Sequence, residues 1–145
     1  MSEFKRIQPA EVPALLEQGY VYLDVRSEPE FEQGHVPGAL NVPLMHAGPG
    51  GMTPNPDFSS VVERCFARHE KLIVGCRSGA RSLRAARMLI ESGFCELCEL
   101  ETGFEGARDA FGRLKPGYAK LGLPIATGRP PGRSYEDVQR RRPGG

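Results

Sequence analysis

Short apolar runs alternate along the chain with segments whose apolar residues recur at helical spacing. The runs are rich in β-branched and aromatic residues, which are typical of β-strands. We predict strands at 20–25, 40–43, 71–76 and 94–100, and helical segments at 10–19, 27–31, 58–68, 83–92, 103–111 and 117–121. Such alternation of strands and helices predicts an α/β fold with a largely parallel sheet.

Two segments are instead rich in glycine and proline. Residues 45–56 have no regular apolar spacing and predict a loop, of a length that compact domains usually reserve for functional or mobile segments. From Pro124 onward the sequence consists largely of proline, glycine and polar residues. We therefore predict a single domain over residues 1–128 and a disordered C-terminal tail over residues 129–145.

Composition and charge narrow the classes of partner. The 145 residues are 39% hydrophobic and 26% charged, as in an ordinary globular domain. The 19 Lys and Arg residues nearly balance the 18 Asp and Glu residues, so we expect neither nucleic acid nor a membrane as a partner. The chain starts with polar residues rather than an apolar signal segment, which predicts a cytoplasmic location where the cysteines are thiols.

The clearest chemical signal is a cysteine at the end of the apolar strand at 71–76. It opens the loop Cys76-Arg77-Ser78-Gly79-Ala80-Arg81-Ser82, which leads into a helix. At the carboxyl end of a parallel strand, backbone N–H groups and the positive end of the following helix attract anions. Gly79 permits a tight turn with inward amides, and Arg77 and Arg81 add positive charge. These features favour the thiolate form of Cys76.

This loop resembles the active-site loop of the rhodanese family. The resemblance extends between Pro9 and Gly128, through the motifs Leu23-Asp24-Val25-Arg26, Glu30-Phe31, 34–43, Gly93-Phe94, 101–106 and Gly122-Leu123-Pro124. The segment with 51–53 and Asn55-Pro56 resembles the small single-domain sulfurtransferases of plants. The family often has a tryptophan before the last of these motifs. This chain has none, and we expect Tyr118 to take its place.

The resemblance implies a fold and a site. The fold is a rhodanese-like three-layer α/β domain at 1–128, with a central, mostly parallel five-stranded sheet flanked by helices. Cys76 is implied as the catalytic residue that carries sulfur as a persulfide. The substrate anion is expected to bind the rest of the loop: Arg77, Ser78, Gly79, Ala80, Arg81 and Ser82. No metal and no cofactor is expected.

The spacing of Cys76 and Arg81, C-x4-R, bears on the reaction. Related phosphatases and arsenate reductases have C-x5-R, which makes room for a tetrahedral anion, whereas the shorter loop resembles that of sulfurtransferases. We therefore expect transfer of sulfur from thiosulfate, or another persulfide donor, to cyanide or a thiol in two half-reactions. The alternative is a relay protein that passes its persulfide to a sulfur-accepting protein and turns over little alone. A rhodanese-like binding domain without activity is disfavoured because the cysteine is present.

Other chemically suggestive residues favour structural interpretations. His35 lies in a turn of the family motif, and we expect it to make structural hydrogen bonds. Asp24 and Arg26 are expected to form an internal ion pair.

Cys95 and Cys98 lie three residues apart on a predicted strand, about 10 Å, with thiols on opposite faces, so they do not suit a disulfide. No second pair of ligands has zinc spacing, since His46 and His69 lie far away in the sequence. A role for Cys95 or Cys98 in accepting sulfur stays open.

Overall fold

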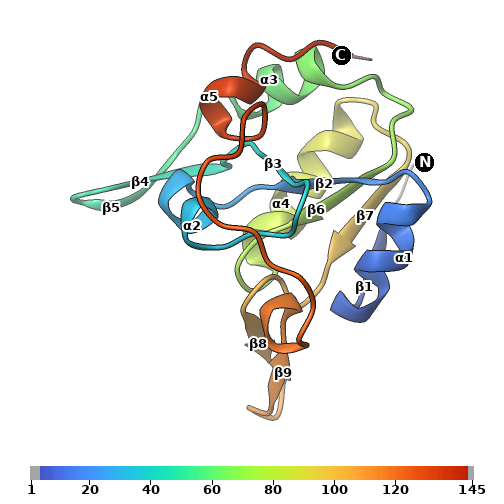
Figure 1. Cartoon of the computed structure of the whole chain (residues 1–145), viewed down its shortest axis with the longest axis vertical. Helices are drawn as coiled ribbons and strands as arrows, with labels where there is room; N and C mark the ends of the chain where they lie inside the picture. Colours follow the sequence, from blue (N-terminus) through green and yellow to red (C-terminus); the bar gives the residue numbers. More distant parts are fainter. Residues whose placement is uncertain (1–3, 144–145) are drawn as a thin grey trace.

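The computed structural model of the chain describes residues 4–143 and has a parallel sheet between two layers of helices (Figure 1). Its five strands lie in the order β1-β7-β6-β2-β3, and each neighbouring pair is parallel. The strands are β1 (Lys5–Ile7), β2 (Val21–Asp24), β3 (Leu40–Asn41), β6 (Leu72–Gly75) and β7 (Leu97–Leu100). The predicted α/β class and five-stranded sheet are confirmed.

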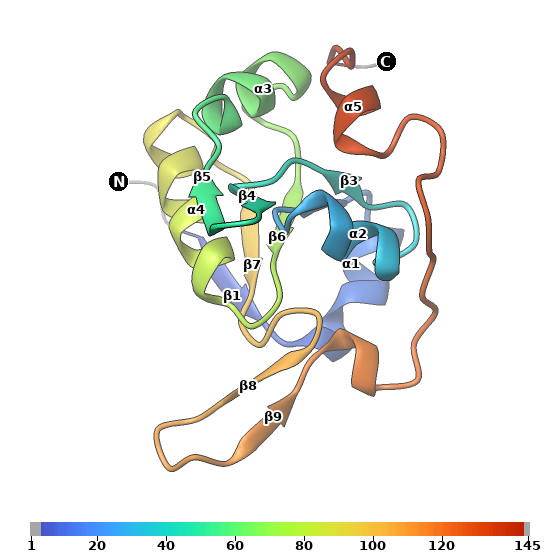
Figure 2. The same cartoon turned by 90° about the vertical axis from the view of Figure 1, so that its left-hand side faces the viewer.

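Helices cover both faces of this sheet. They are α1 (Val12–Glu17), α2 (Glu28–Gln33), α3 (Phe58–Cys65), α4 (Ala80–Glu91) and α5 (Tyr135–Val138), with short 3-10 turns η1 (Pro9–Glu11) and η2 (Tyr118–Lys120). Figure 2 shows α3 and α4 on one side of the sheet and α1 and α2 on the other. Within residues 4–143, no helix is long and apolar enough to cross a membrane.

The central strand β6 is buried at every position, as its continuous apolar sequence predicts. Leu72 and Val74 enter the core under α3 and α4, whereas Ile73 enters the core on the α1 side. Asp24 of β2 is in register with Gly75 of β6. The segments that follow these two strands therefore leave the sheet side by side at its carboxyl edge, where the cysteine loop begins.

Two antiparallel hairpins project from the domain where the sequence predicted other structure. β4 (Met45–Gly48) and β5 (Gly51–Pro54) occupy the predicted loop. β8 (Gly106–Arg108) and β9 (Leu114–Pro116) form a second hairpin, and β8 lies within the segment predicted as a helix at 103–111. That helix prediction is wrong. Gly103, Gly106 and Gly112 adopt positive φ angles there, which a right-handed helix does not allow. The strand β1 was not predicted because it has only three residues, two of them exposed and charged.

The end of the described chain differs from the predicted disordered tail. Tyr135 and Val138 of α5 are 7% and 0% exposed and join the core beneath α3. The side-chain amide of Asn55 donates to the Tyr135 hydroxyl at 3.1 Å, and the Cys65 thiol donates to the Val138 carbonyl at 3.0 Å. Two apolar residues in a polar sequence give little signal, although they suffice to anchor one helical turn. Residues 144–145 lie outside the described part.

This packing predicts that Tyr135 contributes to stability. Tyr135→Ala should lower the free energy of unfolding by about 3 kcal/mol, because it leaves a cavity at the α3 face. Tyr135→Phe removes only the hydroxyl that accepts from Asn55 and should cost about 1 kcal/mol. Denaturant unfolding monitored by circular dichroism measures both. Equal stability of all three proteins would show that this segment does not pack on the domain.

Candidate active site

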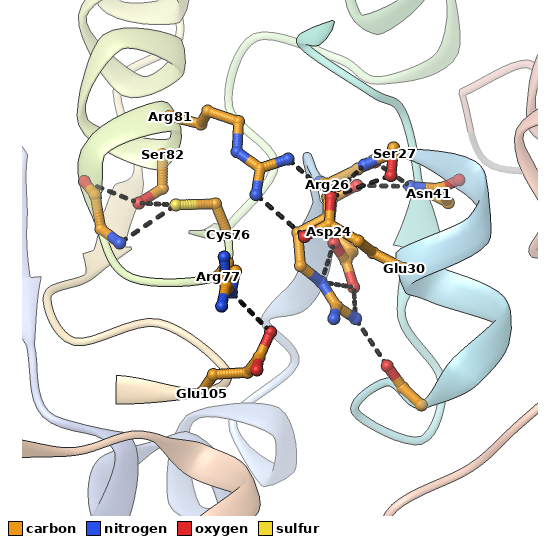
Figure 3. A network of polar contacts seen from close by, with 12 residues as sticks. Asp24, Arg26, Ser27, Glu30, Asn41, Cys76, Arg77, Arg81, Ser82 and Glu105 are labelled. Carbon is orange, nitrogen blue, oxygen red and sulfur yellow. Dashed lines mark hydrogen bonds and ion pairs between the residues drawn. The ribbon is translucent and has the colours of Figure 1, made fainter. Parts of the chain in front are cut away.

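Cys76 lies directly after β6, at the carboxyl edge of the sheet and in front of the first turn of α4 (Figure 3). Its side chain is nearly enclosed, with 1% of the residue exposed. The chain reverses between Cys76 and Gly79, and α4 begins at Ala80. The cysteine therefore faces the end of a helix whose first backbone N–H groups have no acceptor within the helix.

Gly79 makes this reversal possible. Its φ angle of +108° is in the left-handed region, where side chains are strained. The backbone N–H of Gly79 donates to the Cys76 sulfur at 3.1 Å. A Cβ atom at this position would collide with the backbone carbonyl oxygen of Glu101. Both the backbone conformation and the lack of space therefore require glycine, as the sequence predicted for this turn.

The segment that follows β7 supports the loop from behind. The backbone N–H of Phe104 donates to the Cys76 carbonyl at 2.8 Å, and that of Glu105 donates to the Arg77 carbonyl at 2.9 Å. Gly103, with φ +70°, leaves no room for a Cβ atom against the backbone of Arg77. The cysteine loop is thus fixed by backbone contacts to a second loop at the same sheet edge.

The two arginines of the loop are both paired with carboxylates. Arg81 donates through two nitrogens to the two Glu30 carboxylate oxygens of α2, at 2.8 and 3.0 Å. Arg77 donates to Glu105 at 2.9 Å, and both of these side chains are largely exposed. The sequence suggested two free positive charges at the rim. Glu30 and Glu105 offset these charges, so the field at the sulfur owes more to the backbone.

Burial and hydrogen bonds act in opposite directions on Glu30. Burial alone would raise its pKa, but hydrogen bonds from Arg81 and Ser27 hold it at about 2, below the ordinary 4.5. Ser27 and Glu30 form the capping box at the start of α2 that their spacing predicted. One carboxylate therefore caps α2 and also fixes the arginine that ends the cysteine loop.

Ser82 faces the cysteine from the first turn of α4, and its position reveals two residues that the sequence did not single out. Its hydroxyl oxygen lies 3.4 Å from the Cys76 sulfur. It also donates to the carboxylate of Glu99, a buried residue of β7. Arg6 of β1 donates to the other Glu99 oxygen at 2.6 Å. In the sequence, the signal for Glu99 was a glutamate within a largely apolar predicted strand.

The structure divides the predicted site residues into two groups. Cys76, Gly79 and Ser82 are buried and converge on the sulfur. Arg77, Ser78 and Ala80 are exposed at the surface of the loop, and Arg81 extends toward α2. The buried group therefore contacts the sulfur itself, whereas the exposed group forms the outer surface of the loop.

The neighbouring scaffold agrees with the structural roles predicted for other residues. Arg26 donates to Asp24 at 2.7 Å and to the carbonyl of Gly34 at 2.6 Å, in a buried pair. Burial opposes the charge of Arg26, but the Asp24 carboxylate raises its pKa above the ordinary value. His35 is buried and its Nδ1 contacts the Phe31 carbonyl at 2.7 Å. These contacts brace the chain beside the cysteine loop.

Tyr118, which we expected to take the place of a tryptophan, is buried. Its ring stacks on Phe104 at a centroid distance of 6.0 Å, and its hydroxyl donates to the Pro124 carbonyl at 2.7 Å. Because Phe104 also holds the Cys76 carbonyl, this packing supports the loop indirectly. Tyr118 therefore has a packing role, and its replacement of the family's tryptophan stays a prediction.

The other three cysteines are free thiols. Burial raises the pKa of Cys65 and of Cys98, which favours the neutral thiol, whereas Cys95 is exposed. Cys95 and Cys98 form no disulfide, although Cys95 lies before β7 and not on the strand that the prediction assumed. In the described part of the chain, no cluster of three His, Cys, Asp or Glu side chains could hold a metal ion.

Cys76 is thus enclosed at the carboxyl edge of a parallel α/β sheet, where ligands bind in open α/β folds, and a backbone N–H group before a helix contacts its sulfur. Residues 8–110 match the sequence profile described as the rhodanese-like domain. The chain therefore belongs to the rhodanese-domain sulfurtransferase family.

Known proteins agree with this assignment. Thiosulfate sulfurtransferase 16, chloroplastic, of Arabidopsis thaliana is 42% identical over 110 residues, which are 76% of this chain and 82% of that protein. Thiosulfate sulfurtransferase GlpE of Pseudomonas fluorescens is 37% identical over 105 residues, covering 72% and 85%. The crystal structure of Rv0390 from M. tuberculosis has a TM-score of 0.70 at 30% identity, covering 88% of this chain and all of that one.

The geometry predicts that Gly79 tolerates no side chain. Gly79→Ala should lower the free energy of unfolding by at least about 2 kcal/mol, because of the left-handed backbone and the collision with Glu101. Gly50→Ala is the matched control, since a Cβ atom there meets open space. Denaturant unfolding of both variants makes the comparison. If Gly79→Ala were as stable as the control, this turn would not constrain the loop.

The ion pair between Glu30 and Arg81 predicts acid-dependent stability. Since folding lowers the pKa of Glu30 from 4.5 to about 2, its contribution is complete above about pH 4.5 and lost as the pH falls through about 2. The stability difference between wild type and Glu30→Gln should therefore shrink across this range. Unfolding at a series of pH values measures it. Glu28→Gln, on the same helix, should show no such change; if it did, the effect would come from general charge.

Proposed function

We propose that the protein is a thiosulfate sulfurtransferase in which Cys76 carries the transferred sulfur. The observation that carries this proposal is the enclosed sulfur of Cys76, which accepts a hydrogen bond from the Gly79 N–H at 3.1 Å in front of α4. A negative charge on that sulfur is stabilised by the N–H dipole and by the helix terminus. The C-x4-R loop and the relatives named thiosulfate sulfurtransferase support the same reaction.

The first half-reaction moves one sulfur atom. The Cys76 thiolate attacks the outer sulfur of thiosulfate and forms a new S–S bond. The S–S bond of thiosulfate breaks, and its electron pair leaves with sulfite. The negative charge that began on Cys76 ends on the outer sulfur of the persulfide, so atoms and charge balance. In the second half-reaction cyanide or a thiolate attacks that outer sulfur and regenerates the Cys76 thiolate.

The shape of the loop suits this exchange. Cys76 is only 1% exposed, and a persulfide places its outer sulfur about 2 Å further out, where an acceptor can reach it. The first-turn N–H groups of α4 can stabilise the charge on that outer sulfur. Arg77 is exposed, and its surface ion pair with Glu105 is weak enough to exchange for an incoming anion.

One observation favours the second candidate, a relay protein that serves a partner. Phe111 and Leu114, in and beside the turn of the β8–β9 hairpin, are 83% and 67% exposed. The hairpin begins directly after Glu105, the residue that binds Arg77. Exposed apolar side chains near a reactive loop suit contact with another protein. The cytoplasmic location stays a prediction.

The test is the intact mass of the protein after incubation with thiosulfate and removal of the excess. Wild type should gain one sulfur atom, and Cys76→Ala should gain none and lose turnover with cyanide. Cys95→Ala removes the exposed thiol and should behave as wild type. Rapid discharge of the adduct by cyanide would support the enzyme, whereas slow discharge would favour the relay. No adduct on wild type, or an adduct that persists in Cys76→Ala, would contradict the proposal.

A further inference from the structure

A continuous set of polar contacts leads from the Cys76 sulfur through the protein interior to β1. The sulfur lies 3.4 Å from the Ser82 hydroxyl oxygen, which is hydrogen-bonded to one oxygen of the Glu99 carboxylate. Arg6 holds the other carboxylate oxygen at 2.6 Å. Cys76, Ser82 and Glu99 are at most 1% exposed, so the contacts among these three residues are shielded from water, whereas the Arg6 side chain is partly exposed.

The position of the hydroxyl hydrogen follows from the chemistry of Glu99. The Ser82 hydroxyl has two acceptors, the Glu99 carboxylate and the Gly79 carbonyl at 3.3 Å, and its single O–H points to the nearer and charged one, Glu99. The Ser82 oxygen then has lone pairs free, and the Cys76 thiol can donate to one of them. In this arrangement the Cys76 proton lies two hydrogen bonds away from a carboxylate.

The same three residues can also be hydrogen-bonded in the opposite direction, with the proton on Glu99. If Ser82 takes the thiol proton and passes its own hydrogen to Glu99, the neutral carboxyl group donates to Ser82, and Ser82 donates to the Cys76 thiolate. The S–H bond and the old O–H bond break, and two O–H bonds form. The net charge of the three residues does not change, so the shift leaves no additional charge in the interior.

We propose that Glu99 is the internal proton acceptor for Cys76, reached through the Ser82 hydroxyl. This positioning role differs from the stabilisation of a thiolate by the loop alone, because the proton that leaves sulfur stays inside the protein. During sulfur transfer Glu99 keeps this proton while the charge resides on sulfur. It returns the proton when Cys76 is again a free thiol. This last step rests on the proposed function, whereas the proton shift does not.

The charged and titratable groups around the three residues act on both ends of this shift. Arg6 comes from β1, where it also lies near the Gly79 position and 3.8 Å from Glu101. Arg81 of α4 and Tyr22 of β2 interact electrostatically with Cys76. Burial raises the pKa of Tyr22 well above its ordinary value, so Tyr22 stays neutral. Arg6 and Arg81 favour negative charge at the sulfur, whereas the ion pair of Arg6 with Glu99 favours the ionised carboxylate and therefore works against the shift.

The test follows modification of Cys76 by iodoacetamide as a function of pH. The parent protein carries Cys95→Ala so that the exposed thiol does not react, and intact mass gives the rate. If Glu99 accepts the proton, the modification rate plotted against pH should show a plateau between two inflections. These two inflections belong to the coupled pair of Cys76 and Glu99 and not to either residue alone. With Glu99→Gln we expect a single inflection, below which the rate falls about tenfold per pH unit. This readout needs no sulfur transfer, so it fails or succeeds independently of the proposed function.

Two further variants make the result specific. Ser82→Ala interrupts the relay but leaves Arg6 and Glu99 paired, and it should also lose the plateau. Glu101→Gln removes a carboxylate that faces the same arginine outside the relay, and it should retain the plateau.

Some outcomes would overturn the proposal. A single inflection in the parent protein would do so without any variant. A plateau that survives in Glu99→Gln would mean that the proton goes elsewhere. A Glu99→Gln variant that reacts faster than the parent throughout would show that Glu99 only repels the thiolate. If Glu99→Gln does not fold, the parent protein and Ser82→Ala still decide the question.

Discussion

The left-handed turn at Gly79 is the constraint on which the site depends. With φ +108°, this residue turns its N–H toward the Cys76 sulfur and starts α4 one residue later. Because α4 starts there, Ser82 falls on the inner face of the first turn, within 3.4 Å of the sulfur. A shift of one residue in the start of α4 would rotate Ser82 by about 100° and separate it from both of its partners.

The electric field in the cysteine loop comes from arginines that are paired with carboxylates and from backbone N–H groups at the start of α4. Arg81 is held by Glu30 in a half-buried bidentate contact, which fixes its position and offsets its charge. Arg77 forms a single exposed contact, which water and salt weaken. Arg81 is therefore suited to hold α4 against α2, and Arg77 is the more loosely held of the two cations. The attraction for an anion inside the loop is left mainly to the N–H groups.

The sequence predicted the central strands, the long helix and the Cys76 loop because each has a strong local pattern. It could not predict β1, whose three residues form a strand only by pairing with β7, nearly a hundred positions later. The helix expected at 103–111 failed because glycines in this segment adopt positive φ angles. In the site, the glycine of the turn was predictable from its place between strand and helix. The carboxylate partners of both arginines were not, since these pairings depend on tertiary structure.

Glu99 shows why the innermost part of the site escapes sequence analysis. A glutamate in a strand usually lies on an exposed face, because burying its charge without partners is costly. Here Arg6 of the unpredicted strand β1 supplies the opposite charge, and Ser82 supplies a hydrogen bond. Two polar residues from different elements thus make a buried carboxylate acceptable behind the Cys76 sulfur. Because Arg6 is itself partly exposed, this pair does not require the burial of two charges, and it holds a carboxylate within two hydrogen bonds of the Cys76 sulfur.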